Sequence, residues 1–107
     1  MEDFFDLFKY DNNLIVAKYS SKNNFNYITL SLNYKKDGLN WVRGILRRRK
    51  YIYFRDIENV ITSNESVNII IKGKSYIFKF PTNYQTLIFY KGIRLLSEIT
   101  LREELLS

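Results

Sequence analysis

The sequence contains no cysteine and no histidine among its 107 residues. Without cysteine the chain can form neither disulfide bonds nor a thiolate zinc site. Without histidine it lacks the base of Ser-His and Cys-His nucleophile pairs and the commonest ligand of zinc and iron. The closest carboxylate groups, Glu2-Asp3-Asp6 and Glu103-Glu104, lie at the two ends of the chain and do not converge. We therefore expect no catalytic residues, no metal, no cofactor and no small-molecule substrate.

Long apolar runs are also missing. No segment approaches the ~18 consecutive apolar residues that indicate a membrane-spanning helix. The first residues, MEDFFDLFKYDNN, start acidic and contain neither a basic segment nor a small-residue cleavage site. They are therefore not a secretory signal, and we expect a cytoplasmic location.

Aromatic residues are abundant at 17% of the chain, and hydrophobic residues make up 46%. This composition indicates one globular domain over residues 1–107, with a core built from aromatic rings. The formal net charge is +6, which favours an acidic partner. A chain rich in lysine, asparagine, isoleucine and tyrosine also follows from an AT-rich genome, so part of this charge carries no functional meaning.

Hydrophobic periodicity predicts the elements of the first half. Phe4, Leu7 and Phe8 recur at helical spacing within a short helix over 1–10. The apolar run 14–19 and the alternating segment 26–34 predict two strands of a hairpin, joined by a turn at 20–24. The segment 39–47 predicts a short helical insertion, because apolar residues recur there at positions 39, 42, 45 and 46.

The second half is predicted to consist of strands followed by a long helix. The strands are expected at 50–57, 60–63, 67–72 and 75–80, and Pro81 ends the last one. A C-terminal helix over 82–106 is expected to begin at the cap Thr82. Its apolar stripe comprises Tyr84, Leu87, Ile88, Leu95, Leu96 and Ile99, widened by Phe89 and Ile93. Gly92 lies near this stripe and indicates close approach of the helix to a sheet.

These elements predict an α+β fold, a small antiparallel and partly open β-barrel capped by the C-terminal helix. Residues 50–100 resemble the pleckstrin-homology-like superfamily, especially its bacterial members. The resemblance lies in a strand that ends in Phe54-Arg55-Asp56-Ile57, the strand 67–71, the aromatic strand 76–80 and the helix that follows. It implies seven strands in an open barrel and a non-enzymatic module that binds lipids, peptides or proteins.

Phosphoinositide-binding members of that superfamily place several basic residues around the first hairpin loop. In this chain the corresponding segment, 19–24, contains a single lysine. The sequence thus departs from the lipid-binding pattern. Bacterial relatives are often protein-interaction or oligomerising modules, and the departure favours a protein partner.

The segment WVRGILRRRKYIYF, residues 41–54, holds five of the seventeen lysine and arginine residues. Trp, Tyr and Arg are the residue types enriched at the energetic centres of protein interfaces. We predict a partner-binding surface made of Trp41, Arg43, Arg47, Arg48, Arg49, Lys50, Tyr51 and Tyr53. Two alternatives stay open: an anion-binding patch for nucleic acid or an anionic membrane, and core residues beside a solvated basic turn.

The C-terminal segment SEITLREELLS keeps apolar residues beyond the length that a capping helix needs. We predict self-association through Leu101, Leu105 and Leu106, with fraying into solvent as the alternative.

Together these features predict a cytoplasmic adaptor of a bacterium or its mobile elements, which docks on an acidic protein surface. Two alternative functions remain: a phage- or plasmid-encoded inhibitor of a host defence enzyme, and a module that binds anionic lipid or nucleic acid.

Overall fold

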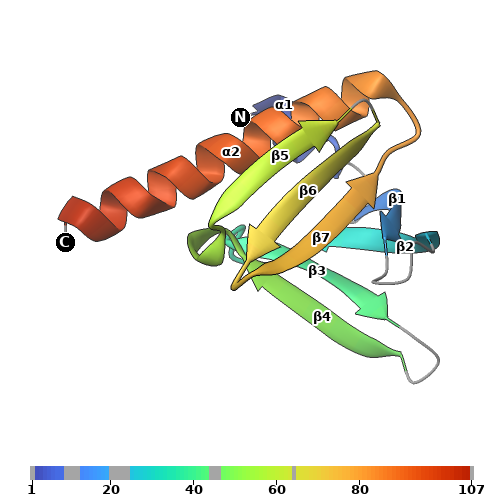
Figure 1. The fold of residues 1–107 in the computed structure, drawn as a ribbon, viewed down its shortest axis with the longest axis horizontal. Coiled ribbons are helices and arrows are strands. Elements are labelled where there is room, and N and C mark those ends of the chain that lie inside the picture. Colours follow the sequence, from blue (N-terminus) through green and yellow to red (C-terminus); the bar gives the residue numbers. More distant parts are fainter. Residues whose placement is uncertain (1, 9–12, 20–24, 44–46, 64, 107) are drawn as a thin grey trace.

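The computed structural model describes residues 2–8, 13–19, 25–43, 47–63 and 65–106 (Figure 1). Two α-helices, a 3-10 helix and seven strands follow one another in this part of the chain. They are α1 (Glu2–Asp6), β1 (Asn13–Tyr19), β2 (Phe25–Leu32), β3 (Gly38–Arg43), β4 (Arg48–Tyr53), η1 (Phe54–Asp56), β5 (Asn59–Ser63), β6 (Ser66–Ile71), β7 (Lys74–Lys79) and α2 (Asn83–Leu106).

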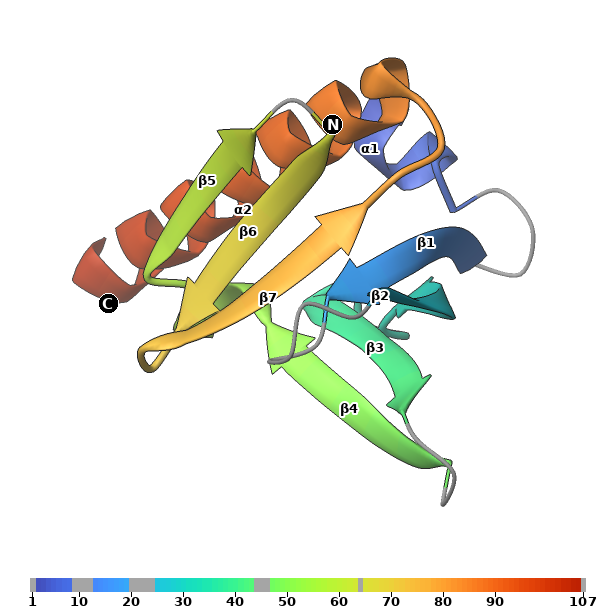
Figure 2. The ribbon, with the colours of Figure 1, turned by 45° about the vertical axis from the view of Figure 1, so that its right-hand side comes forward.

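The seven strands form one antiparallel sheet with the order β4-β3-β2-β1-β7-β6-β5. The sheet folds over at the contact of β1 with β7, where only Ala17 pairs with Lys79 and Lys18 with Phe78. Its two halves, β1–β4 and β5–β7, therefore cross each other (Figure 2). Because β4 and β5 stand at opposite ends of the order, the barrel is open between them. The predicted partly open barrel is confirmed.

The core lies between the two halves of the sheet and α2. Alternate residues of the strands point inward, as the two-residue period of a strand requires. In β6 this alternation buries Val67, Ile69 and Ile71, and in β3 it buries Leu39 and Trp41. Phe89 and Ile93 of α2 complete the core and have no exposed surface.

The C-terminal helix confirms its predicted start. The backbone N–H of Gln85 donates to the Thr82 hydroxyl at 3.2 Å, so Thr82 caps the helix. The predicted stripe was centred on the wrong residues, however. Phe89 and Ile93 are its buried centre, whereas Tyr84 and Leu87 are exposed.

The short N-terminal helix packs on α2 through the buried ring of Phe4, and the buried ring of Phe8, just after the helix, meets the Phe4 ring edge-on. The Phe4 ring lies 5.8 Å from the Phe89 ring, centroid to centroid. A Cβ atom at Gly92 would lie 2.6 Å from the Cβ of Phe4, well inside van der Waals contact. Gly92 is therefore required for close approach, but the neighbour is α1 and not the sheet as predicted.

The helical insertion predicted at 39–47 is wrong over the residues that the structure describes. Residues 38–43 form strand β3, which pairs with β2 and along its whole length with β4. Leu39 and Trp41 pair with Ile52 and Lys50 on the inner side of β4, whereas Val42 pairs with Arg49 on the outer side and is exposed, as the two-residue period of a strand requires. Residues 44–46, and the turn predicted at 20–24, lie outside the described residues. The strand predicted at 50–57 ends at Tyr53, and η1 follows from Phe54.

Candidate functional site

The basic segment that the sequence singled out lies on the hairpin of β3 and β4. The strands pair from Gly38↔Tyr53 to Arg43↔Arg48. Arg47, Arg48 and Arg49 are exposed at the start of β4, and the positive φ of Arg47, 51°, marks the turn that leads into the strand. From Gly38 to Arg55 the sequence has no acidic residue. Within the described residues, no carboxylate forms an ion pair with these three arginines.

The two faces of β4 have different surroundings. Lys50 and Ile52 point toward the inside of the barrel, opposite Trp41 and Leu39 of β3. Ile52 is buried, and the Lys50 ammonium lies 5.5 Å from the centroid of the Tyr76 ring, a cation–π contact. Lys50 is half-buried, so its charge is less available to a partner than those of the exposed arginines.

Arg49 and Tyr51 lie on the outer face. Tyr51 is 50% exposed, and Val42 beside Arg49 on β3 is 37% exposed. Tyr53 follows on the same face and is half-buried, with the guanidinium of Arg55 5.1 Å from its ring centroid. The outer face of this hairpin therefore combines arginine with partly exposed aromatic rings.

A chain of side-chain hydrogen bonds fixes Arg49. Its Nη1 donates to Oδ1 of Asn40 at 2.6 Å, and Nδ2 of Asn40 donates to Oδ1 of Asn33, also at 2.6 Å. Nδ2 of Asn33 then donates to the carboxylate of Asp37 at 3.4 Å. Asn40 is 8% exposed, so a buried side chain holds the guanidinium of Arg49, which is itself exposed. We call Asn33, Asn40 and Arg49 the asparagine relay.

The sequence analysis missed Asn33 and Asn40, because it placed a helix where β3 lies. As a strand, the segment 38–43 places Asn40 and Val42 on the outer face, where Asn40 pairs with Tyr51 and Val42 with Arg49. The sequence carries only a weak signal for this strand, because Trp41 and Val42 are both apolar and interrupt the alternation.

The structure separates the predicted binding residues into three groups. Arg47, Arg48, Arg49, Tyr51 and Tyr53 lie on β4 or the turn before it. Arg49, Tyr51 and Tyr53 share the outer face, whereas the exposed Arg48 pairs with Arg43 and is on the same side as Lys50. Trp41 is 0% exposed and packs in the core, so it is not part of any surface and its predicted partner contact is corrected. The side chain of Arg43 lies outside the described part of the chain. We call the set Arg47, Arg48, Arg49, Tyr51 and Tyr53 the β4 patch.

Comparison with known proteins shows which fold carries this patch. No protein-family model matches the sequence, and no curated protein matches it. Among solved structures, Inner Membrane Complex Sub-compartment Protein 3 (ISP3) from Toxoplasma gondii is similar with a TM-score of 0.78 and 13% identity, over 94% of this chain and 86% of that chain. The PH domain from PfAPH has a TM-score of 0.67 and 13% identity over 89% of each chain, and that from TgAPH 0.65 and 11% over 88% of each. The chain has a pleckstrin-homology-like fold. At these identities the likeness concerns the fold alone, and the predicted bacterial source stays a prediction.

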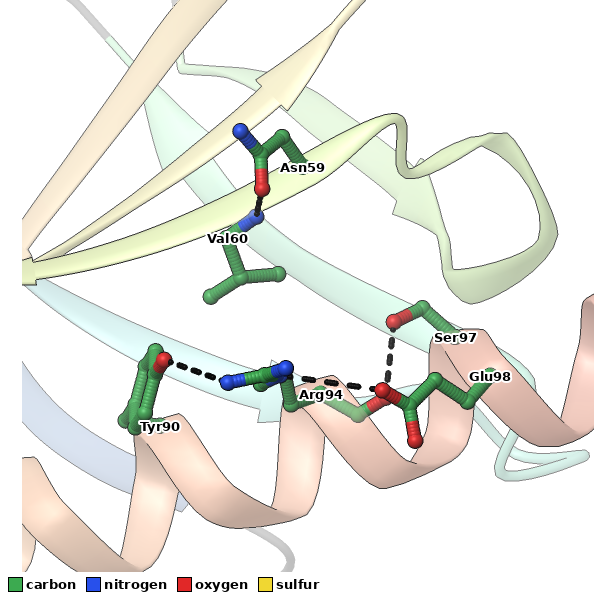
Figure 3. A network of polar contacts seen from close by, with 6 residues as sticks. All are labelled: Asn59, Val60, Tyr90, Arg94, Ser97 and Glu98. Atoms are coloured by element: carbon green, nitrogen blue, oxygen red, sulfur yellow. Dashed lines mark hydrogen bonds and ion pairs between the residues drawn. The ribbon is translucent and has the colours of Figure 1, made fainter.

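On the α2 side of this PH-like fold, the side chain of Arg94 already has partners within the helix. Nη1 of Arg94 donates to the Tyr90 hydroxyl at 3.0 Å, and its Nε lies 3.7 Å from Oε1 of Glu98 (Figure 3). The Tyr90 hydroxyl and, next to it, the Glu98 carboxylate raise the pKa of Arg94 above its ordinary value. The charge of Arg94 is thus paired within the helix, unlike those of Arg47 and Arg48.

The PH-like fold also has a shallow groove between α1 and α2. Its volume is about 170 Å³, and it is lined by Asp3, Phe4, Ile88, Lys91, Gly92 and Leu95. This is below the several hundred Å³ that are usual for small-molecule sites. Among the described residues, no cluster of three or more carboxylates could hold a metal ion, and no helix has the length and apolar character needed to cross a membrane.

Of the residues predicted for self-association, only the side chain of Leu105 is described. It is 86% exposed near the end of α2. The side chains of Leu101 and Leu106 lie outside the described part.

Proposed function

We propose that this chain is a non-catalytic binding module of the cytoplasm that docks on an acidic protein surface through the β4 patch. The observation that carries the proposal is the group of exposed arginines at 47–49, beside a half-exposed tyrosine, on a hairpin without any acidic residue. Arginine forks pair with carboxylates in bidentate geometry, and Arg and Tyr are the types enriched at interface centres.

The asparagine relay supports a role in binding. A guanidinium that is already held in one position loses less conformational freedom when it meets a carboxylate than a freely rotating one. The patch therefore combines one pre-positioned arginine, Arg49, with two that lack a described partner, Arg47 and Arg48. An acidic protein surface would satisfy the unpaired charges.

A charge-reversal pair tests this function. In the first variant Arg47 and Arg48 are replaced by Glu, and in the matched control the exposed Lys72 and Lys74 of the β6–β7 turn are replaced by Glu. Each replacement lowers the net charge by two, so both variants carry +2 instead of +6. Tagged wild type and both variants are used to capture proteins from nuclease-treated lysate of the source cells, with identification by mass spectrometry.

We expect wild type and the lysine control to recover the same partner in stoichiometric amount, and the arginine variant to lose it. Partner recovery should fall as salt rises, because exposed charges are screened. Equal capture by all three proteins would contradict docking through the patch. Recovery of only nucleic acid or lipid would instead make the patch a general anion-binding surface.

A further inference from the structure

Strand β4 is an edge strand of the sheet. It pairs with β3 on one side, and no described strand pairs with its other side. In Figures 1 and 2 it is the lower margin of the sheet, next to the opening of the barrel. A strand at such a border presents backbone N–H and C=O groups that can pair with an added strand.

The register with β3 shows which groups face the open side. The N–H of Phe54 donates to the carbonyl of Asp37 at 3.0 Å, one step beyond the pair Gly38↔Tyr53. In an antiparallel ladder, hydrogen-bonded and non-hydrogen-bonded pairs alternate. The backbone groups of Lys50 and Ile52 therefore point to β3. Those of Arg49, Tyr51 and Tyr53 point to the open side.

The same three residues carry outward side chains of the β4 patch. A strand added at this border would form main-chain hydrogen bonds with them, and its alternate side chains would lie beside the Arg49 guanidinium and the Tyr51 ring. Cross-strand neighbours of opposite charge stabilise such a pair, and like charges destabilise it. Backbone pairing and charge recognition thus coincide on one strand.

The basic residues of β4 determine which kind of strand can pair with its open side. Arg48, Arg49 and Lys50 stand in sequence on β4, directly after Arg47. A second copy of the chain would bring another basic strand against this one, so the charges oppose pairing between copies. An extended segment rich in Asp or Glu meets the opposite sign over the first half of the strand, RRK of RRKYIY.

We propose that β4 binds an extended acidic segment of the partner as an additional strand of the sheet. This inference depends on the proposed function, docking on an acidic protein, and adds the way in which the partner binds. Main-chain hydrogen bonds to Arg49, Tyr51 and Tyr53 supply affinity, and the arginines supply the preference for acidic sequence.

The probe is a peptide obtained by selecting a displayed random-peptide library against the wild-type protein at low salt. Peptides of about eight residues are long enough, because strands usually span 3–10 residues. The best-enriched sequence is synthesised, and we expect it to be acidic. Its affinity is measured for wild type, for the Arg47→Glu/Arg48→Glu variant and for the Lys72→Glu/Lys74→Glu control.

Amide hydrogen exchange of the full chain, followed residue by residue by NMR, tests whether the peptide adds as a strand. It requires no substitution. In the free protein the amides of Lys50 and Ile52 are expected to exchange slowly and those of Arg49, Tyr51 and Tyr53 quickly. Bound peptide should slow the second group by at least about tenfold, since each gains a hydrogen bond, and change the first group little.

Two variants at position 51 measure independently how much one main-chain hydrogen bond contributes to peptide affinity. Tyr51→Pro removes the N–H on the open side without removing a ladder hydrogen bond to β3, and proline is tolerated on border strands for this reason. Tyr51→Ala removes only the side chain. We expect Tyr51→Pro to bind the peptide about tenfold more weakly than Tyr51→Ala, because one main-chain bond is lost and the partner's carbonyl is left unpaired. If the proline variant does not fold, the exchange pattern of the wild type decides.

The outcomes separate this inference from the proposed function. A selection without acidic sequences, or a peptide that binds the Arg47→Glu/Arg48→Glu variant as tightly as wild type, overturns both. An acidic peptide that requires the arginines but leaves the exchange of Arg49, Tyr51 and Tyr53 unchanged overturns strand addition alone. Docking through side chains would then remain.

Discussion

Trp41 lies between the two halves of the sheet and contacts the half to which it does not belong. Its ring meets the Phe78 ring edge-on, with centroids 5.3 Å apart and an interplanar angle of 87°. The Tyr76 ring lies at 6.0 Å and 72°. Edge-to-face pairs add to the stabilisation that comes from removing the rings from water. Trp41 therefore joins β3 to β7 across the core.

Replacing Trp41 by Ala should lower the free energy of unfolding by about 3–5 kcal/mol, the usual cost of removing a large buried aromatic side chain. Urea denaturation followed by circular dichroism measures this change. The matched control is Tyr51→Ala on the neighbouring strand, which should cost about 1 kcal/mol or less because its side chain is half exposed. If the Trp41 variant kept wild-type stability but lost partner binding, Trp41 would be a surface anchor after all.

At the scale of elements, α1 depends on its contact with α2. A helix of five residues, Glu2–Asp6, does not persist alone in water. The buried Phe4 ring holds it, because this ring lies directly over Gly92 of α2. The glycine thus serves the packing of two helices, at a position where alanine would favour the helix by about 1 kcal/mol on propensity alone.

At position 92, helix propensity favours alanine, whereas packing against Phe4 requires glycine. The variant Gly92→Ala therefore shows which of the two effects is larger. We expect it to destabilise the protein by about 1–3 kcal/mol, because the new methyl group displaces the Phe4 ring. In a Phe4→Ala background the same change should cost nothing or stabilise, since the space is then free. Thermal or urea unfolding of the four proteins in this double-mutant cycle measures the coupling. A stabilising effect of Gly92→Ala in the wild-type background would show that the two helices are not in close contact.

The elements also show which sequence patterns were sufficient. The strands β2 and β7 were predicted because alternation of side-chain character over six to eight residues matches the period of a strand and not that of a helix. The strand β6 was predicted from its central run of three isoleucines. β3 was missed because Leu39 and Val42 happen to lie three residues apart, and a short apolar segment fits both periods. The buried centre of α2 was misplaced because apolar residues occupy more of its surface than one stripe. Only the packing partner decides which of them are buried.

The basic residues of the β4 patch were recognised from composition, whereas the asparagine relay depends on the pairing of β3 with β4.

At the scale of the whole molecule, the β4 patch and the end of α2 are separate surfaces of different character. Figure 1 shows the C-terminal part of α2 continuing past the strands, at the opposite side of the molecule from the end of β3 and the start of β4. Leu105 is 86% exposed there. We propose that this end of the helix mediates self-association, which would display several β4 patches on one assembly and raise the avidity for an acidic partner.

The self-association proposal predicts that the molar mass in solution depends on Leu105. Size-exclusion chromatography with light scattering should show wild type forming dimers or larger assemblies with rising concentration, and Leu105→Glu remaining monomeric, because a charge cannot be buried in an apolar contact without a partner. Lys72→Gln on the β6–β7 turn changes the net charge by the same amount and should behave as wild type. High salt should preserve the assemblies, since apolar contacts are not screened, while it weakens docking on acidic peptides. A wild-type protein that is monomeric at every concentration, or a Leu105→Glu variant with wild-type mass, would contradict self-association and leave the β4 patch as a single-copy binding surface.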